Sequence, residues 1–99
     1  MALETTAFDP AEYLDDDEAL AGYLSEALET SDPAFIADAL GVVARAKGMK
    51  EVAESAGLSR ESLYRALSAK GNPEFGTVLK VISALGFRLN AAPSIHPAE

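Results

Sequence analysis

The chain has 99 residues, of which 48% are hydrophobic and 24% are charged, so it suits one small folded domain rather than a disordered chain. It contains no cysteine, which excludes disulfide scaffolds, thiolate zinc sites and cysteine nucleophiles. Its one histidine, His96, lies near the end of the sequence and no base accompanies the serines, so neither hydroxyl nucleophiles nor a metal site are expected. We therefore expect a binding protein without a cofactor rather than an enzyme.

No apolar run reaches the roughly 18 residues that a membrane helix needs, because Asp38, Arg45 and Lys80 interrupt the candidates. Residues Met1–Phe8 lack the basic start and the apolar centre of a signal peptide. The sequence therefore predicts a cytoplasmic protein with no membrane partner.

Acidic and basic residues are separated along the chain, which the net charge of −8 conceals. Residues 1–40 contain eleven acids and no base, whereas residues 41–99 contain all eight bases against five acids. Such asymmetry indicates two partners of opposite charge, and the alternative is two solvated faces of one domain. The acidic part disfavours non-specific binding of polyanions, but a local basic patch can still contact phosphates.

The first predicted elements are a turn and a helix. Asp9 followed by Pro10 predicts a brief helical turn over residues 9–14. The acidic run 15–18 predicts the start of a helix that ends near residue 28. Helix capping is preferred to a cation site for this run, because no glycine or distal glutamate follows at calcium-loop spacing. The apolar face of the helix has the spacing i, i+4, i+8, at Leu20, Leu24 and Leu28.

Four more helices and a strand follow. Asp32 and Pro33 predict the start of a helix that ends near Gly48, with Arg45 and Lys47 complementing its C-terminal dipole. Shorter helices are expected over residues 50–56 and 60–70, and a last helix over 74–85. Apolar and polar residues alternate over 87–91, which predicts a short strand. Residues 93–99 are expected to form a disordered tail.

Residues 49–68 carry the most specific pattern in the sequence. Ala53 provides the small side chain that two steeply crossing helices need where they touch, and Gly57 suits the left-handed turn between them. Leu63, six residues after the glycine, packs the second helix onto the first. Further core and capping positions are Val52, Leu58, Leu67 and Ser59. The pattern predicts a helix-turn-helix, and the alternative is a plain helical hairpin with this spacing by coincidence.

The outward face of the second helix of this motif carries side chains that can read DNA. Arginine can bond to guanine O6 and N7, glutamate can accept from cytosine N4, and tyrosine can contact a thymine methyl or a phosphate. Residues at the start of the helix and just beyond its end are expected to contact the DNA backbone. The alternative for each is a solvated surface side chain. The predicted DNA-binding residues are Lys50, Ser59, Arg60, Glu61, Tyr64, Arg65, Ser68, Lys70 and Asn72.

Five stretches of the chain together resemble a known family: residues 13–18, 32–36, 52–67, 72–73 and 77–81. Residues 32–89 resemble the Xre/Cro-type helix-turn-helix. The whole chain resembles the addiction module antidote proteins, antitoxins of type II toxin–antitoxin systems related to HigA. This resemblance implies a homodimeric repressor that binds its own operator and neutralises a co-encoded toxin of the RelE/ParE type. The family often has a phosphate-binding glutamine where this chain has Met49, so Lys50 or Lys47 is expected to supply that contact.

The predicted fold is therefore all-α, with five to six helices, an acidic helical N-terminal arm and a short C-terminal strand. Its expected parts are the arm at 1–31, a helix-turn-helix domain with dimerisation elements at 32–92, and the tail at 93–99. Candidate dimer contacts are Leu79, Ile82, Phe87 and Leu89. The arm is expected to cover the toxin, and the alternative is that it packs on the core as a solubilising cap. Its candidate toxin anchors are Tyr13, Leu14, Leu20, Tyr23 and Leu24.

Two other functions fit the same residues. One is an Xre-type transcriptional regulator without a toxin partner. The other is a protein-interaction module whose helix-turn-helix has lost DNA binding. A neighbouring reading frame for a small basic protein would favour the antitoxin, and an operator-shift assay would identify the interaction module.

Overall fold

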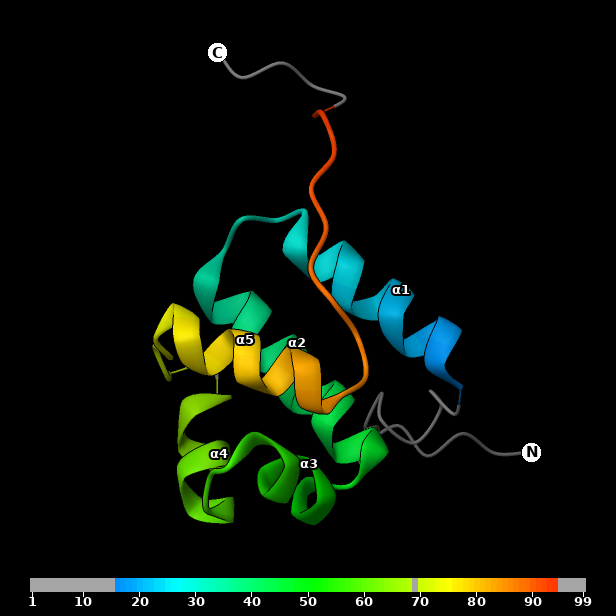
Figure 1. Ribbon diagram of the computed structural model, residues 1–99. Coiled ribbons are helices and arrows are strands. Elements are labelled where there is room, and N and C mark those ends of the chain that lie inside the picture. The colour runs from blue at the N-terminus through cyan, green and yellow to red at the C-terminus, as the bar shows by residue number, and fades with distance from the viewer. Residues whose placement is uncertain (1–15, 69, 95–99) are drawn as a thin grey trace, which may run out of the picture.

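The computed structural model describes residues 16–68 and 70–94, and this part of the chain is all-helical (Figure 1). Its helices are α1 (Asp17–Leu28), α2 (Pro33–Lys47), α3 (Met49–Ala56), α4 (Arg60–Ala66) and α5 (Phe75–Ala84). The predicted all-α class is confirmed over these residues. The turn expected at residues 9–14 and the end of the expected tail, 95–99, lie outside them.

Aspartates begin the two longest helices, as the sequence predicts. The carboxylate of Asp16 accepts a hydrogen bond of 2.7 Å from the Ala19 amide at the start of α1. The carboxylate of Asp32 accepts one of 3.1 Å from the Ala34 amide, and Pro33 occupies the first position of α2. Asp17 forms an ion pair of 2.8 Å with Lys47, and the capping role that the sequence predicts for this acidic run is observed at Asp16.

One hydrophobic core joins all five helices. Leu20, Leu24 and Ala27 of α1 are at most 4% exposed and belong to the same core as residues of every other helix. The partners that are nearly inaccessible to solvent are Leu40, Val43, Leu63, Val81 and Leu85. The helical part of the expected arm therefore packs on the domain that follows it, as in the capping alternative, and does not lie apart from it.

The recognition-helix candidate α4 is shorter than predicted, because it ends at Ala66 instead of near Lys70. The chain turns there, with the Gly71 amide donating to the Ser68 carbonyl at 2.8 Å. A Cβ atom on Gly71 would lie 2.7 Å from the carbonyl oxygen of Arg65, so the returning chain needs a glycine at this position. The helix therefore ends where the backbone folds back over its last carbonyls.

The strand expected at residues 87–91 is not formed in the described residues of this single chain. The segment after α5 leaves the helices as an extended stretch that runs past α1 (Figure 1). The Ala91 amide bonds to the side chain of Asn90 at 3.0 Å rather than to a neighbouring strand. Alternating residues can form a strand only when a second strand supplies hydrogen-bond partners, and residues 16–68 and 70–94 contain none beside this segment.

Replacement of Leu24 by alanine should lower the free energy of unfolding by about 2–5 kcal/mol, because it leaves a cavity in the shared core. Its exposed neighbour Ser25 provides the control, since Ser25→Ala should change stability by less than about 0.5 kcal/mol. Urea unfolding of both variants measures the difference. Equal effects would mean that α1 does not contribute to the core.

Candidate nucleic-acid interface

Helices α3 and α4 are joined by the three-residue turn 57–59, and the residues at their contact are those that the sequence singles out. Gly57 adopts a left-handed conformation with φ of 74°, which residues other than glycine rarely adopt. The Leu58 amide donates to the Ala53 carbonyl at 2.9 Å and closes the turn. Ala53 is 2% exposed and Leu63 is fully buried, and both belong to the core that α3 and α4 share.

Ser59 fixes the start of α4. Its hydroxyl oxygen accepts a hydrogen bond of 3.0 Å from the Ser62 amide, as expected for an N-cap. With Leu63 and Leu67 buried, the opposite side of the helix faces solvent. All nine candidate DNA-binding residues are exposed: Lys50, Ser59, Arg60, Glu61, Tyr64, Arg65, Ser68, Lys70 and Asn72.

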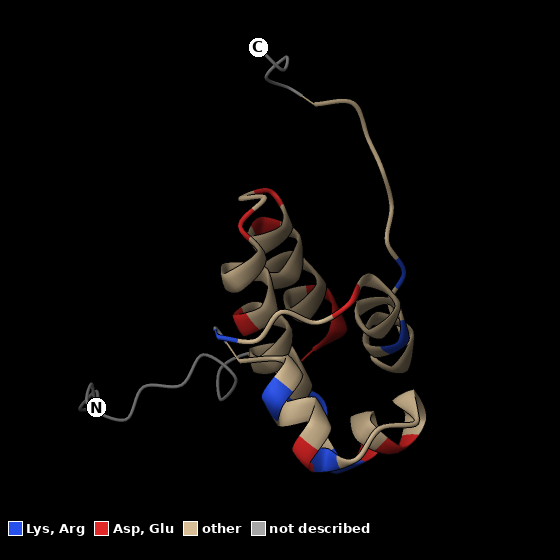
Figure 2. Ribbon diagram, turned by 90° about the vertical axis from the view of Figure 1, so that its left-hand side faces the viewer, with Lys and Arg blue, Asp and Glu red and all other residues tan. Residues whose placement is uncertain are grey.

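The loop at one end of the molecule has only acids among its charged residues, whereas the helices at the other end, α3 and α4, carry both acids and bases. The loop that joins α1 to α2 carries Glu29 and Asp32 and lies at the end opposite α3 and α4 (Figures 1 and 2). Three basic residues lie on and just beyond α4, at Arg60, Arg65 and Lys70, with one acid, Glu61, among them. The acidic loop therefore lies away from the exposed side of α4. Beside α4, its negative charge would repel an anionic partner.

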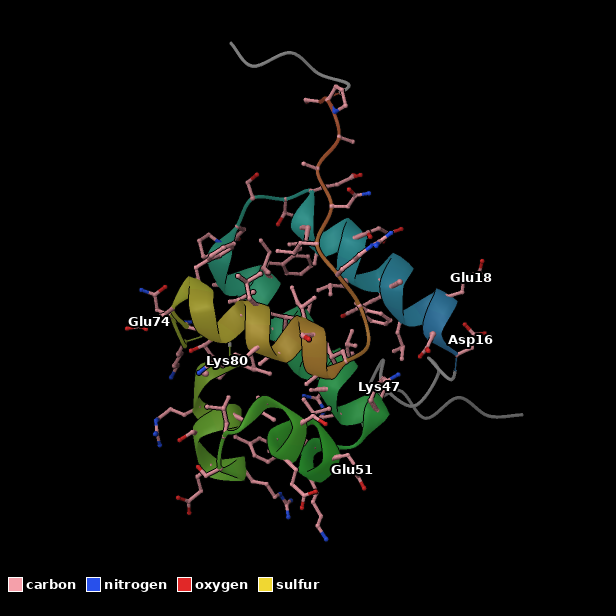
Figure 3. All side chains as sticks on the ribbon, in the orientation of Figure 1. Asp16, Glu18, Lys47, Glu51, Glu74 and Lys80 are labelled. Atoms are coloured by element: carbon pink, nitrogen blue, oxygen red, sulfur yellow. The ribbon has the colours of Figure 1, made fainter. Side chains whose placement is uncertain are left out.

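Lys47, one of the two expected substitutes for the phosphate-binding glutamine, is directed toward α1. Its ammonium lies 2.8 Å from Asp17 and 5.7 Å from the centre of the Phe87 ring. Figure 3 shows Lys47 beside Asp16 at the start of α1, away from α4. Lys50, the other expected substitute, is exposed on α3.

Helix α2 approaches the end of α4 closely at Gly41. A Cβ atom added to this buried glycine would lie 2.8 Å from the carbonyl oxygen of Leu67. Beside the contact is a hollow of about 190 Å³ between α2 and α4, lined by Asp38, Gly41, Arg45, Met49, Tyr64, Leu67 and Ser68. The hollow brings Arg45, which the sequence analysis assigned only to the dipole of its own helix, next to two candidate DNA-binding residues.

Some of the candidate toxin and dimer residues are buried in the core, and others are exposed. Leu20 and Leu24 are core residues and Tyr23 packs partly buried against the core, so the two leucines do not form a surface anchor. Ile82 is 2% exposed, which removes it from the accessible surface of α5. Its neighbour Leu79 is 42% exposed, and Leu89 is 37% exposed. Tyr13 and Leu14 lie outside the described residues.

Two exposed aromatic side chains were missed by the sequence analysis. Phe75 is 67% exposed at the start of α5, and Phe35 is 49% exposed on α2. Phe75 precedes Leu79 by four residues, and this spacing could have identified it as part of the same helix face. Phe35 lies among apolar residues at the start of α2, between Ala34 and Ile36, and this position gave no such signal.

Comparison with known proteins gives a family. A family model described as "Probable addiction module antidote protein" matches residues 4–93. A protein of Haemophilus influenzae that is described as uncharacterized is 46% identical over 87 residues, which cover 88% of this chain and 90% of that protein. No solved structure matches the chain. No helix in residues 16–68 and 70–94 is long and apolar enough to cross a membrane.

The close approach of α2 to α4 predicts opposite effects for the same substitution at two helical glycines. Gly41→Ala should lower the free energy of unfolding by about 1–3 kcal/mol, because the new methyl group meets backbone that cannot move freely. Gly22→Ala on α1 meets no atom within 4 Å and should instead raise stability by up to about 1 kcal/mol. Thermal unfolding measures both. A stabilising effect at Gly41 would contradict the close contact.

Proposed function

Because this chain belongs to the family of probable addiction module antidote proteins, we propose that it neutralises a co-encoded RelE/ParE-type toxin and represses its own operon by binding operator DNA. The observation that supports the DNA-binding part is the exposed side of α4, where Arg60, Tyr64 and Arg65 project from a helix fixed by burial of Leu63. We interpret α3, its turn and α4 as a DNA-binding helix-turn-helix of the Xre/Cro type. On this proposal the chain is a binding protein and not an enzyme.

In the proposed complex, α4 lies in the major groove. Arg60 and Arg65 are then placed to bond to guanine, and Tyr64 to contact a thymine methyl or a phosphate. Glu61 would favour a cytosine by accepting from its N4 group. Ser59, Ser68, Lys50, Lys70 and Asn72 surround the helix and would contact the DNA backbone, which sets the register without reading bases.

A homodimer is part of the proposal. One chain has few basic side chains on this surface, so a single chain would bind one DNA half-site weakly. Exposed apolar side chains of α5 and the following segment support it: Phe75, Leu79 and Leu89. A symmetric dimer would place two α4 helices about 34 Å apart on successive major grooves of a palindromic operator. Pairing of residues 87–91 with a second copy would supply the strand partner that the single chain lacks.

Replacement of both Arg60 and Arg65 by alanine should abolish specific operator binding while the melting temperature stays nearly unchanged. Each lost guanine contact costs about 1–3 kcal/mol per half-site, and both side chains are exposed. An electrophoretic shift titration with the upstream region of the gene measures the affinity, and the wild-type complex should contain two chains per site. Unaltered affinity of the double variant would exclude α4 as the reading helix.

The toxin is proposed to bind the exposed side of α1 rather than its leucines. Glu18 and Glu26 are exposed on α1, Glu29 is exposed at its C-cap, and α1 carries no base. A toxin that acts on RNA or nucleoprotein is expected to present a basic surface, so these acids would steer its approach. Tyr23 and the preceding Tyr13 and Leu14 remain candidate anchors, whereas Leu20 and Leu24 hold α1 to the core.

Replacing Glu18, Glu26 and Glu29 together by glutamine should slow association with the toxin roughly tenfold at low salt, because electrostatic steering is lost. The matched control is the set Glu51→Gln, Glu54→Gln and Glu74→Gln, which removes three exposed acids elsewhere. Stopped-flow mixing with the toxin encoded by the adjacent gene measures the rates. Equal rates in the two variants would place the toxin site away from α1.

Two alternatives make different predictions in these experiments. A regulator without a toxin partner would bind the operator but would not protect cells from the product of the adjacent gene. A protein-interaction module would protect cells without binding the operator. Co-expression with the adjacent gene, together with the shift assay, distinguishes all three functions, and the antitoxin must give both protection and operator binding.

A further inference from the structure

Residues 29–35, which form the loop after α1 and the first turn of α2, are all exposed. This stretch, the loop surface, lies at the end of the molecule opposite α3 and α4 (Figures 1 and 2). Its last residue, Phe35, is 49% exposed. Among residues 16–47, all of which the structure describes, Phe35 is the one large hydrophobic side chain that is exposed. The core therefore does not account for an aromatic ring at this position.

The backbone that carries the ring is held in place on both sides. The Thr30 hydroxyl donates to the Ala27 carbonyl at 2.6 Å and accepts from the Asp32 amide at 3.1 Å. The Asp32 carboxylate then caps the start of α2. Leu28 and Ile36, one at each end of the loop surface, pack against the core. A partner that covers the exposed ring would therefore lose little conformational entropy in ordering this loop.

Acids outnumber bases around the loop surface. Glu29 and Asp32 lie within it, and Glu26 precedes it on α1 with an exposed side chain. One base, Arg88, borders this end of α1 in a hollow that also contains Leu28. Three acids against one base repel a nucleic acid, and they repel a second copy that approaches with the same surface. A protein with a basic surface is attracted instead.

We propose that the loop surface binds the basic toxin of the proposed function, with Phe35 as its apolar anchor. Protein interfaces are enriched in aromatic side chains, and most of the binding energy comes from a few such anchors that are surrounded by polar residues. Leu20 and Leu24 are buried, so α1 offers acids to a toxin but no large exposed apolar side chain. The acids set the rate of association, and burial of the ring sets the lifetime of the complex. This inference rests on the proposed neutralisation of a toxin.

The kinetics of toxin binding separate the two roles. Phe35→Ala removes the ring, and Phe35→Tyr keeps one. Asp32→Asn removes a charge but keeps a residue that caps helices well. Its control is Glu54→Gln, which removes an exposed acid of α3. Biolayer interferometry with the immobilised toxin encoded by the adjacent gene gives the association and dissociation rates of each full-length variant, and sedimentation equilibrium and thermal unfolding give its oligomeric state and melting temperature.

Phe35→Ala should raise the dissociation rate about tenfold or more and leave the association rate within about twofold of the wild-type value. Phe35→Tyr should keep most of the wild-type affinity. At low salt, Asp32→Asn should slow association more than Glu54→Gln does, with little change in dissociation. Oligomeric state and melting temperature should stay close to those of the wild-type protein in every variant.

A dissociation rate of Phe35→Ala equal to that of the wild-type protein would overturn this inference, and wild-type binding of the toxin would leave the proposed function standing. Loss of a wild-type dimer in Phe35→Ala would also overturn it, because the ring would then contact a second copy. A fall of several degrees in the melting temperature would do the same, since Phe35 would then support the core. If the wild-type protein does not bind the toxin, the proposed function fails first and this inference fails with it.

Discussion

The shortness of α4 is the constraint on which the rest of the structure depends. A helix of seven residues is unstable in isolation, because nucleation costs more than so few hydrogen bonds return. Its position must therefore come from packing. Leu63 and Leu67 are buried beneath it, and the cap of Ser59 fixes its first turn.

Small residues surround α4 where its neighbours approach. Ala53 lets α3 cross close to it, Gly41 admits α2 to within contact of the Leu67 carbonyl, and Gly71 allows the chain to return over its last turn. At Gly41 and at Gly71 a Cβ atom would meet a backbone carbonyl oxygen, and Ala53 is buried. Together they hold the exposed arginines and tyrosine of α4 on rigid elements, which is the condition for precise recognition of any partner.

The sequence predicted the helices and the contact of α3 with α4, because caps and periodic leucines act locally. It did not predict what each apolar face touches. Leu20 and Leu24 have the same i, i+4 spacing whether they face a core or a partner, and only the observed packing of α1 distinguishes these. The same limit explains Ile82, a core residue of α5 that was expected at the dimer surface.

Positions that depend on distant parts of the chain were the least predictable. Gly41 is an unremarkable glycine in the sequence, and its contact with Leu67 joins residues 26 positions apart. The sequence analysis assigned Arg45 only to the dipole of its own helix. The hollow that Arg45 borders is formed by residues of three helices, so the pattern of one helix could not reveal it. The strand over 87–91 was expected from alternation, which records the tendency of a segment to pair but not the presence of a partner.

The packing of α1 also bears on how two binding surfaces can coexist in so small a molecule. Leu24 of α1 and Leu63 of α4 belong to one core, so neither surface can move far without disturbing the other. The acidic loop after α1 and the basic side of α4 nevertheless lie at opposite ends (Figure 2). A basic partner at this loop and an anionic partner on α4 would therefore not compete for space. Any coupling between them would have to pass through the shared core, and it would act equally in both directions.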